Sequence, residues 1–130
     1  MNLQEISTPA LAYLGDCVLE LCVRRYLIEQ GFSTSRNLNR EALRYVRAGA
    51  QAEAMKRILP VLTEVEEGYF KRGRNIGHTN VPKSATVSEY RAATGMEVLF
   101  GYLHLSEQTA RIEELFLIGY INTAQSDTDV

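Results

Sequence analysis

The stretch Leu11-Ala12-Tyr13-Leu14-Gly15-Asp16-Cys17-Val18-Leu19-Glu20-Leu21 is an apolar run interrupted by a glycine, an aspartate and a glutamate. At about 100° per residue, the angular step of an α-helix, five residues share one face, namely Leu11, Leu14, Val18, Leu21 and Cys22. We expect this face to be buried. The opposite face carries Ala12, Asp16, Glu20 and Val23, and it should border a polar environment.

Asp16 is the residue of this stretch that most needs an explanation. A carboxylate desolvated among leucines requires a strong partner, and a metal cation is one such partner. The pattern by itself favours a plainer interpretation, because charged residues on a helix usually form its wet face. In that interpretation Asp16 faces solvent or pairs with Arg24 or Arg25.

Apolar residues recur at helical spacing along the whole chain, and this pattern predicts an all-α fold. Apolar periodicity, capping residues and helix breakers predict helices at about residues 8–30, 35–47, 48–60, 62–74, 88–105 and 106–121. Gly31 should end the first helix, and Ser106 should cap the last. We expect one domain over residues 1–121, with six or seven helices, followed by a polar tail at 122–130.

Composition excludes several classes of protein. The chain has 130 residues, 45% of them hydrophobic, which is enough for one core, and its net charge of −2 excludes a uniformly basic nucleic-acid binder. Cys17 and Cys22 point in different directions on one helix, so we expect them to be reduced core residues. Neither a signal peptide nor a membrane span is evident, so we expect a cytoplasmic protein.

A basic segment interrupts this acidic background. Residues 68–88 contain four Lys and Arg residues and no Asp or Glu. Guanidinium, ammonium and amide groups suit a phosphate backbone, and the candidates in this region are Lys71, Arg72, Arg74, Asn75 and Lys83. Arg91 is a further candidate. The alternatives are a solvated helix end whose cations complement the dipole and, for Arg91, a packing pair with Tyr90.

Glu97 is a second isolated carboxylate, in a helix of apolar and small residues. If the helices at 8–30 and 88–105 pack side by side, Asp16 and Glu97 could meet. Mg²⁺ is typically held by one or two carboxylates, with water and phosphate oxygens completing the shell, and it can support phosphodiester hydrolysis. The sequence has no Glu-x-x-His di-iron motif, phosphate loop or nucleophile elbow.

Two segments resemble a known family. Leu11–Leu19 resembles the signature helix of the ribonuclease III catalytic domain, and Gly95–Leu103 resembles its second acidic helix. Further matches, in the same order as in the smaller Mini-ribonuclease III branch, are Glu20, Tyr45-Val46, Ala48, Ala50-Gln51-Ala52, Arg72-Gly73-Arg74-Asn75, Tyr90-Arg91 and Ala93-Thr94. The resemblance covers roughly residues 7–121.

The resemblance implies a homodimeric, all-α endoribonuclease that hydrolyses double-stranded or structured RNA with Mg²⁺, for which Mn²⁺ can substitute. It implies that Asp16 and Glu97 are the catalytic metal ligands of each subunit, with Glu20 and Thr94 close by. It further implies that the basic residues, including Arg91, bind RNA. The expected substrate is precursor large-subunit ribosomal RNA, with a ribosomal protein as accessory partner and no membrane contact.

Two departures from the larger ribonuclease III enzymes bear on the metal site. Ala12 and Thr94 occupy positions where those enzymes have acids, so we expect one firmly held Mg²⁺ and a second recruited by the RNA. A non-catalytic RNA-binding or ribosome-assembly protein on the same fold is the main alternative. The presence of both Asp16 and Glu97 argues against it. The acid-free basic segment argues against a plain helical dimerisation module.

Overall fold

The computed structural model describes residues 1–76 and 83–122. Within these residues it contains no strand, which confirms the all-α prediction. The α-helices are α1 (Thr8–Glu29), α2 (Ser35–Val46), α3 (Ala48–Ile58), α4 (Glu64–Arg74), α5 (Val87–Leu105) and α6 (Thr109–Phe116). Shorter helical turns are η1 (Leu3–Glu5), η2 (Leu59–Val61) and the π-helical η3 (Leu117–Ile121). In this described part of the chain, no helix has the length and apolarity needed to cross a membrane. Most of the predicted tail, residues 123–130, lies outside the described residues.

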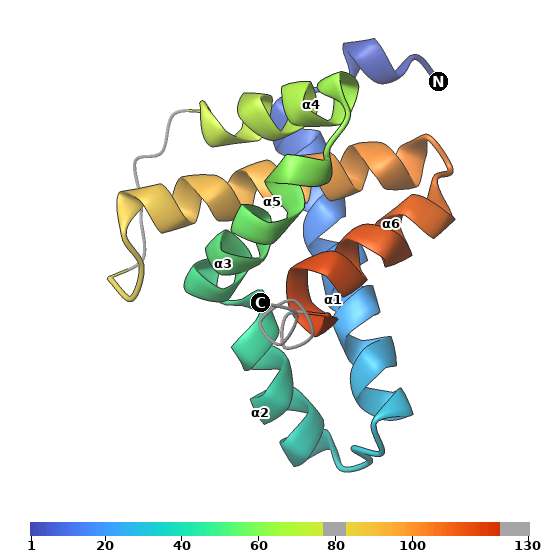
Figure 1. Cartoon of the computed structure of the whole chain (residues 1–130), viewed down its shortest axis with the longest axis vertical. Coiled ribbons are helices and arrows are strands. Elements are labelled where there is room, and N and C mark those ends of the chain that lie inside the picture. The colour runs from blue at the N-terminus through green and yellow to red at the C-terminus, as the bar shows by residue number, and fades with distance from the viewer. Residues whose placement is uncertain (77–82, 123–130) are drawn as a thin grey trace.

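Helix α5 is the centre of the fold. Its buried residues include Met96, Val98, Leu99, Phe100 and Leu103, each with 0% of its surface exposed. Because these residues point in several directions around the helix, α5 needs neighbours on more than one side. Helices α1, α3 and α4 pack directly against it, and Figure 1 shows α5 crossing the middle of the molecule beneath α4.

The buried face of α1 differs from the predicted one. Val23 is fully buried, whereas Leu21 is 66% exposed, so the assignment of these two residues was wrong. The reason is that α1 contacts α5 through Gly15, which turns the buried face toward Leu19 and Val23. Cys17 is likewise exposed rather than in the core.

The helix ends follow local capping rules, with two differences from the prediction. Helix α5 begins at Val87, one residue before the predicted start at Ser88, because Thr86 and Glu89 form a reciprocal capping box. Ser106 does not cap α6, since its hydroxyl donates to the carbonyl of Tyr102, 2.7 Å away, at the end of α5. The predicted stop at Gly31 is confirmed, because Gly31 adopts a φ of 97° directly after α1.

A buried ion pair joins the start of α4 to α6. The guanidinium of Arg111 donates to both carboxylate oxygens of Glu66, at 2.9 and 2.8 Å, and to the carbonyl of Val61 at 2.8 Å. Glu66 also accepts the backbone N–H of Thr63 at 2.9 Å, so it caps its own helix. The hydrogen bonds from Arg111 hold the pKa of Glu66 below its usual range.

Replacing Arg111 by Met should lower the free energy of unfolding by about 3 kcal/mol, because it leaves the Glu66 carboxylate buried without its partner. Urea unfolding at neutral pH measures this loss. The loss should shrink on acidification, since the stabilisation by an ionised Glu66 disappears as pH falls through its lowered pKa. Arg24→Met, which breaks an exposed pair with Glu20, is the matched control and should cause no measurable change. Equal effects of the two substitutions would contradict the assignment.

Candidate active site

Two glycines bring the backbones of α1 and α5 into direct contact. A Cβ atom added at Gly15 would lie 1.6 Å from the carbonyl oxygen of Glu97. One added at Gly101 would lie 2.1 Å from the carbonyl oxygen of Leu11. Real Cβ atoms do not approach this closely, so only glycine fits at either position. We call this contact of α1 with α5 at Gly15 and Gly101 the glycine crossing. Since Asp16 follows Gly15 directly, the glycine crossing places Asp16 beside Glu97.

The Asp16 and Glu97 carboxyl groups interact across this crossing. Asp16 is exposed, whereas Glu97 is largely covered. Burial, the negative charge of Asp16 and a hydrogen bond between the two carboxyls raise the pKa of Glu97 to about 8. In the metal-free protein Glu97 therefore holds a proton at neutral pH and donates it to Asp16. A divalent cation held between the two carboxyl groups would offset the repulsion that raises the pKa of Glu97.

The ion pairs considered for Asp16 do not form. Arg24 pairs with Glu20 at 3.2 Å, and Arg25 pairs with Glu29 at 3.0 Å. Asp16 is thus left with Glu97 as its interaction partner at the crossing. Of the plainer interpretation of the sequence, the arginine pair is therefore wrong, whereas the exposure of Asp16 to solvent is confirmed.

The donor set fits a hard divalent cation. Among residues 1–76 and 83–122, no group of three or more His, Cys, Asp or Glu side chains comes together to hold a metal. Asp16 and Glu97 would therefore supply carboxylate oxygens alone, leaving the other positions to water and phosphate oxygens. This is the typical environment of Mg²⁺ rather than of zinc, which prefers four protein ligands including His or Cys at structural sites.

The two residues predicted close to the metal ligands have partners of their own. The Glu20 carboxylate accepts a hydrogen bond from Arg24 at 3.2 Å. The Thr94 hydroxyl lies one turn before Glu97 and donates to the carbonyl of Tyr90 at 3.0 Å. Thr94 therefore presents only an acceptor oxygen toward other groups, and Glu20 would have to leave Arg24 to reach the site.

The predicted basic residues separate into two sets. Lys71 pairs with Glu67 at 3.1 Å. The guanidinium of Arg72 lies over the Tyr69 ring and donates to the Thr8 hydroxyl and the Ile6 carbonyl, at 3.0 and 3.1 Å. Arg72 thus fastens the chain before α1 to α4, so a substitution there would change packing as well as charge.

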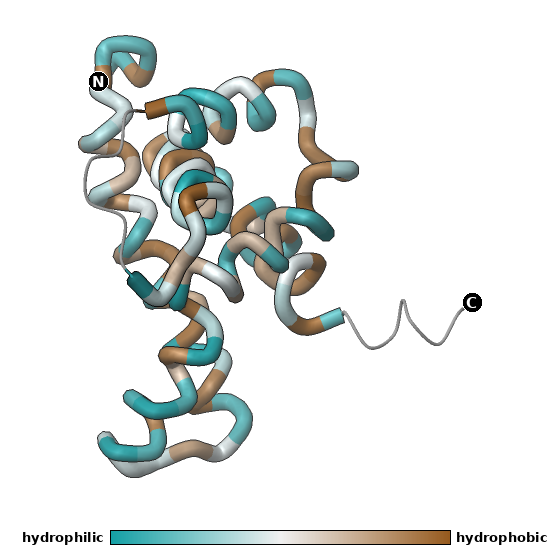
Figure 2. Tube along the Cα trace, turned by 90° about the vertical axis from the view of Figure 1, so that its left-hand side faces the viewer, coloured by the Kyte–Doolittle hydropathy of each residue, from teal (hydrophilic) through white to brown (hydrophobic). Residues whose placement is uncertain are grey.

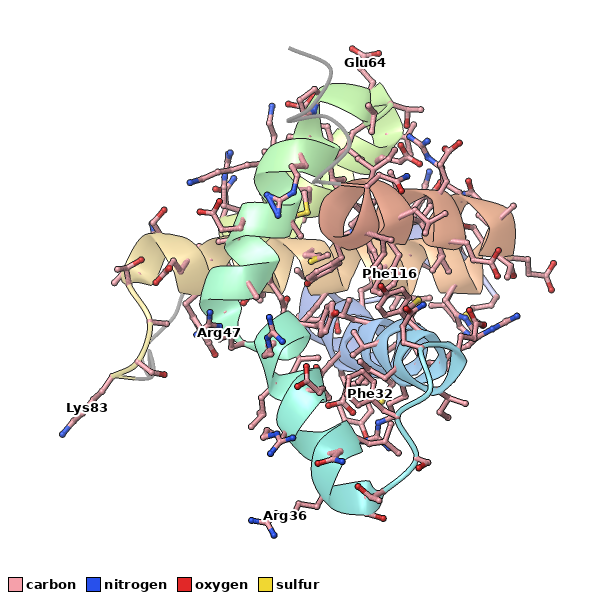
Figure 3. The ribbon with its side chains drawn as sticks, turned by 60° about the horizontal axis from the view of Figure 1, so that its bottom comes forward. Phe32, Arg36, Arg47, Glu64, Lys83 and Phe116 are labelled. Carbon is pink, nitrogen blue, oxygen red and sulfur yellow. The ribbon has the colours of Figure 1, made fainter. Side chains whose placement is uncertain are left out.

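The second set forms an open basic surface. Arg74, Asn75, Ser88 and Arg91 line a hollow of about 400 Å³ between the end of α4 and the first turns of α5. Lys83 lies beyond it and extends away from the body of the molecule, at the left of Figure 3. The remainder of the predicted loop, residues 77–82, lies outside the described residues. A phosphate group could reach the guanidinium and amide groups here without breaking a salt bridge that the structure describes.

An exposed apolar stripe on α1 was not predicted from the sequence. Tyr13, Leu21 and Ile28 are 81%, 66% and 63% exposed, and Cys17 is exposed between them. These residues recur at helical spacing on the side away from α5. The signal was present in the sequence, because the helix carries more apolar residues than one buried face requires. Exposed apolar surface of this kind marks an interaction site.

The raised pKa of Glu97 predicts how pH affects the metal-free protein. As pH rises, the unfolded chain loses this proton near the ordinary value of 4.5, and the folded chain loses it only near 8. Stability should therefore fall between about pH 5 and pH 8, by at most about 1.4 kcal/mol per pH unit. The Glu97→Gln variant has no such titrating group. Its free energy of unfolding should therefore increase relative to that of the wild type as pH rises over the same range.

Urea unfolding of both proteins in a chelating buffer, at several pH values, measures this difference. Added Mg²⁺ should shrink the advantage of Glu97→Gln, because it stabilises the charged wild-type pair. Parallel stability profiles for the two proteins would show that Glu97 is not desolvated beside Asp16.

Comparisons with known proteins show the family and the fold of the chain. The family model described as Ribonuclease III domain matches residues 9–108. The chain is 48% identical over 105 residues to Mini-ribonuclease 3 of Symbiobacterium thermophilum, covering 81% of each chain. It is 46% identical over 114 residues to Mini-ribonuclease 3 of Enterococcus faecalis, covering 86% of each. A crystal structure of a Fusobacterium nucleatum protein superposes with a TM-score of 0.81 at 32% identity, covering 89% of this chain and 93% of that one.

Proposed function

Because the chain belongs to the ribonuclease III domain family, and within it to the Mini-ribonuclease 3 group, we propose that Asp16 and Glu97 hold the Mg²⁺ with which it cleaves RNA. The protein is an endoribonuclease of the ribonuclease III type, specific for double-stranded RNA. Enzymes of this family depend on divalent metals. The observation that carries the proposal is the pairing of these two acids at the glycine crossing, where burial and mutual repulsion raise the pKa of Glu97.

Each acid has a separate part in the proposed chemistry. Asp16, being exposed, would offer its carboxylate to the cation. Glu97 would have to release the proton that it holds in the metal-free protein before its carboxylate could hold the cation. When bound, the cation supplies Lewis acidity and activates water for attack on the phosphodiester. The bond between phosphorus and the 3′ oxygen breaks, and the leaving oxygen takes up a proton.

We propose one firmly bound Mg²⁺ per subunit, with Mn²⁺ able to replace it. Ala12 and Thr94 offer no carboxylate, so a second cation would depend on phosphate oxygens of the RNA. Glu20 is proposed to orient water near the site after release from Arg24. Among the basic residues, the open surface of Arg74, Asn75, Lys83 and Arg91 is proposed to hold the RNA backbone, with Lys71 and Arg72 at its edge.

We propose that two copies of the chain associate through the exposed stripe of Tyr13, Cys17, Leu21 and Ile28 on α1. The exposure of its apolar side chains supports this choice, and Cys17 directly follows Asp16 in the sequence. From the family resemblance we further propose precursor large-subunit ribosomal RNA as substrate, a ribosomal protein as accessory partner, and the cytoplasm as the place of action.

The test is cleavage of a structured RNA duplex, compared with the separated single strands, by the purified chain. We expect cleavage of the duplex with Mg²⁺ or Mn²⁺ and none with a chelator. Isothermal titration with Mg²⁺ alone, without RNA, should report one strong site per chain. Metal-independent cleavage, or duplex binding without any cleavage, would overturn the proposal, and the second result would favour a non-catalytic RNA-binding role.

A further inference from the structure

Four arginines form a row along the solvent side of α2. They are Arg36, Arg40, Arg44 and Arg47, and each is exposed. Their spacing of four, four and three residues places them in one stripe of the helix surface. The opposite face of α2, with Leu38, Ala42 and Tyr45, packs against the core. We call the four residues the α2 arginine ridge.

The charge of the ridge is largely unneutralised. Among the described residues, Arg36 and Arg47 have no side-chain partner. Arg40 donates to the neutral amide oxygen of Asn37 at 3.0 Å. Arg44 pairs with Glu41 at 3.0 Å, yet it remains 73% exposed. Since Glu41 is the single acid within residues 35–47, this stretch has an excess of three positive charges.

The ridge lies next to the open basic surface at the start of α5. A Cβ atom at Gly49 would lie 3.0 Å from a carboxylate oxygen of Glu89, so the start of α3 touches the first turn of α5. This places Arg47, just before α3, at the end of the ridge nearest that turn. Glu89 does not neutralise the ridge by an ion pair that the structure describes, and its other oxygen accepts the N–H of Thr86.

The figures show the same continuity from outside. In Figure 3 the labelled side chain of Lys83 lies at the far left, Arg47 lies near the junction of α2 and α3, and Arg36 lies at the bottom, at the far end of α2. In Figure 2, hydrophilic and hydrophobic positions alternate along the projecting end that α2 forms with the end of α1, as expected of a helix with one buried face. Basic groups therefore extend from the α4–α5 region down to the far end of α2.

The geometry points to the phosphate backbone of an RNA duplex as the ligand of this ridge. At 1.5 Å per residue, the four arginines span about 16 Å, which is long enough to meet several phosphates in succession. Guanidinium groups bind phosphate oxygens in pairs, and they hold position without reading sequence. Resting on the proposed function, we propose that the α2 arginine ridge grips duplex RNA outside the cleaved segment.

Salt-dependent binding tests this proposal. Affinity for a long RNA duplex is measured by fluorescence anisotropy at several salt concentrations, with all variants carrying Asp16→Asn to prevent cleavage. Arg36→Gln/Arg47→Gln should bind more weakly and should flatten the slope of log affinity against log salt by about 1.8, or 0.9 per lost phosphate contact. Adding Arg40→Gln should bring the change to about 2.7.

The matched control is Arg25→Gln/Lys56→Gln, which removes two equally exposed cations from other helices. It should leave the salt slope unchanged. Circular dichroism checks that every variant retains its helices.

A ridge variant with the wild-type slope would overturn the inference while leaving the proposed cleavage function intact. If the ridge variants lose binding to poly-glutamate but keep the RNA binding of the wild type, the ridge binds an acidic protein and not RNA. Failure of the unmutated chain to cleave any duplex would refute the proposed function, whatever the ridge variants do.

Discussion

Asp16→Asn should lower the rate of duplex RNA cleavage at least about a thousandfold, because it removes a charged ligand that acts on the reacting phosphate through the cation. Asn keeps the shape of the side chain, so the loss would report chemistry rather than folding. Single-turnover cleavage with saturating protein measures the step after RNA binding. Affinity for the duplex should change little or should rise, since a negative charge facing the phosphate backbone has been removed.

Stability measurements separate this effect from misfolding. In the metal-free protein, Asp16→Asn should be at least as stable as the wild type, because it relieves the repulsion that raises the pKa of Glu97. Glu97→Gln should behave in the same way and lose activity to a similar extent. Glu29→Gln, near the end of α1 where the carboxylate pairs with Arg25, is the control and should retain most of the activity. Cleavage that survives either of the first two substitutions would refute the assigned metal ligands.

Gly15→Ala should destabilise the fold by an amount on the order of 4 kcal/mol, the largest stability effect that we expect from adding a single methyl group. The added Cβ would lie 1.6 Å from the Glu97 carbonyl oxygen, which belongs to the helix backbone and cannot rotate away. The two helices would have to separate, and the contact would be lost along with the position of Asp16. Urea unfolding measures the loss, and titration with Mg²⁺ should show weaker binding.

Gly68→Ala is the matched control for the glycine crossing. Gly68 lies in α4 with nothing within 4 Å of its added Cβ, so alanine should stabilise the helix there by about 1 kcal/mol. The two substitutions add the same methyl group to helical glycines and should have opposite signs. A Gly15→Ala protein as stable as the wild type would show that α1 and α5 do not touch through their backbones.

Much of the fold followed from local rules. The six helices were predicted near their observed positions because apolar spacing and capping residues lie close together in the sequence, as at Thr34 and Gly31. Differences arose where a cap competes with a neighbour. Helix α5 starts before Ser88 because Thr86 caps it, and Glu89, three residues after Thr86, completes the capping box.

The sequence predicted the two acids of the candidate site, but not how the residues around them pack. Asp16 and Glu97 stood out as lone acids in apolar helices, and the structure brings them together. The exposure of Leu21 and the packing role of Arg72 were missed, because both depend on partners distant in sequence. Leu21 is exposed because the contact between Gly15 and α5 turns another face of α1 toward the core. Arg72 donates hydrogen bonds to Ile6 and Thr8, which lie more than 60 residues earlier in the chain.

The glycine crossing also determines when during synthesis an active site can exist. Asp16 belongs to the first α-helix and Glu97 to the fifth, so the site requires a contact between distant parts of the chain. Such contacts form late, because a long loop must close before they contribute any stability. Since α5 is also the central helix of the core, a nascent chain on the ribosome has neither a core nor a metal site until α5 has emerged. With Asp16 and Glu97 as the proposed metal ligands, we expect that each copy of this nuclease cannot cleave RNA until α5 has been made.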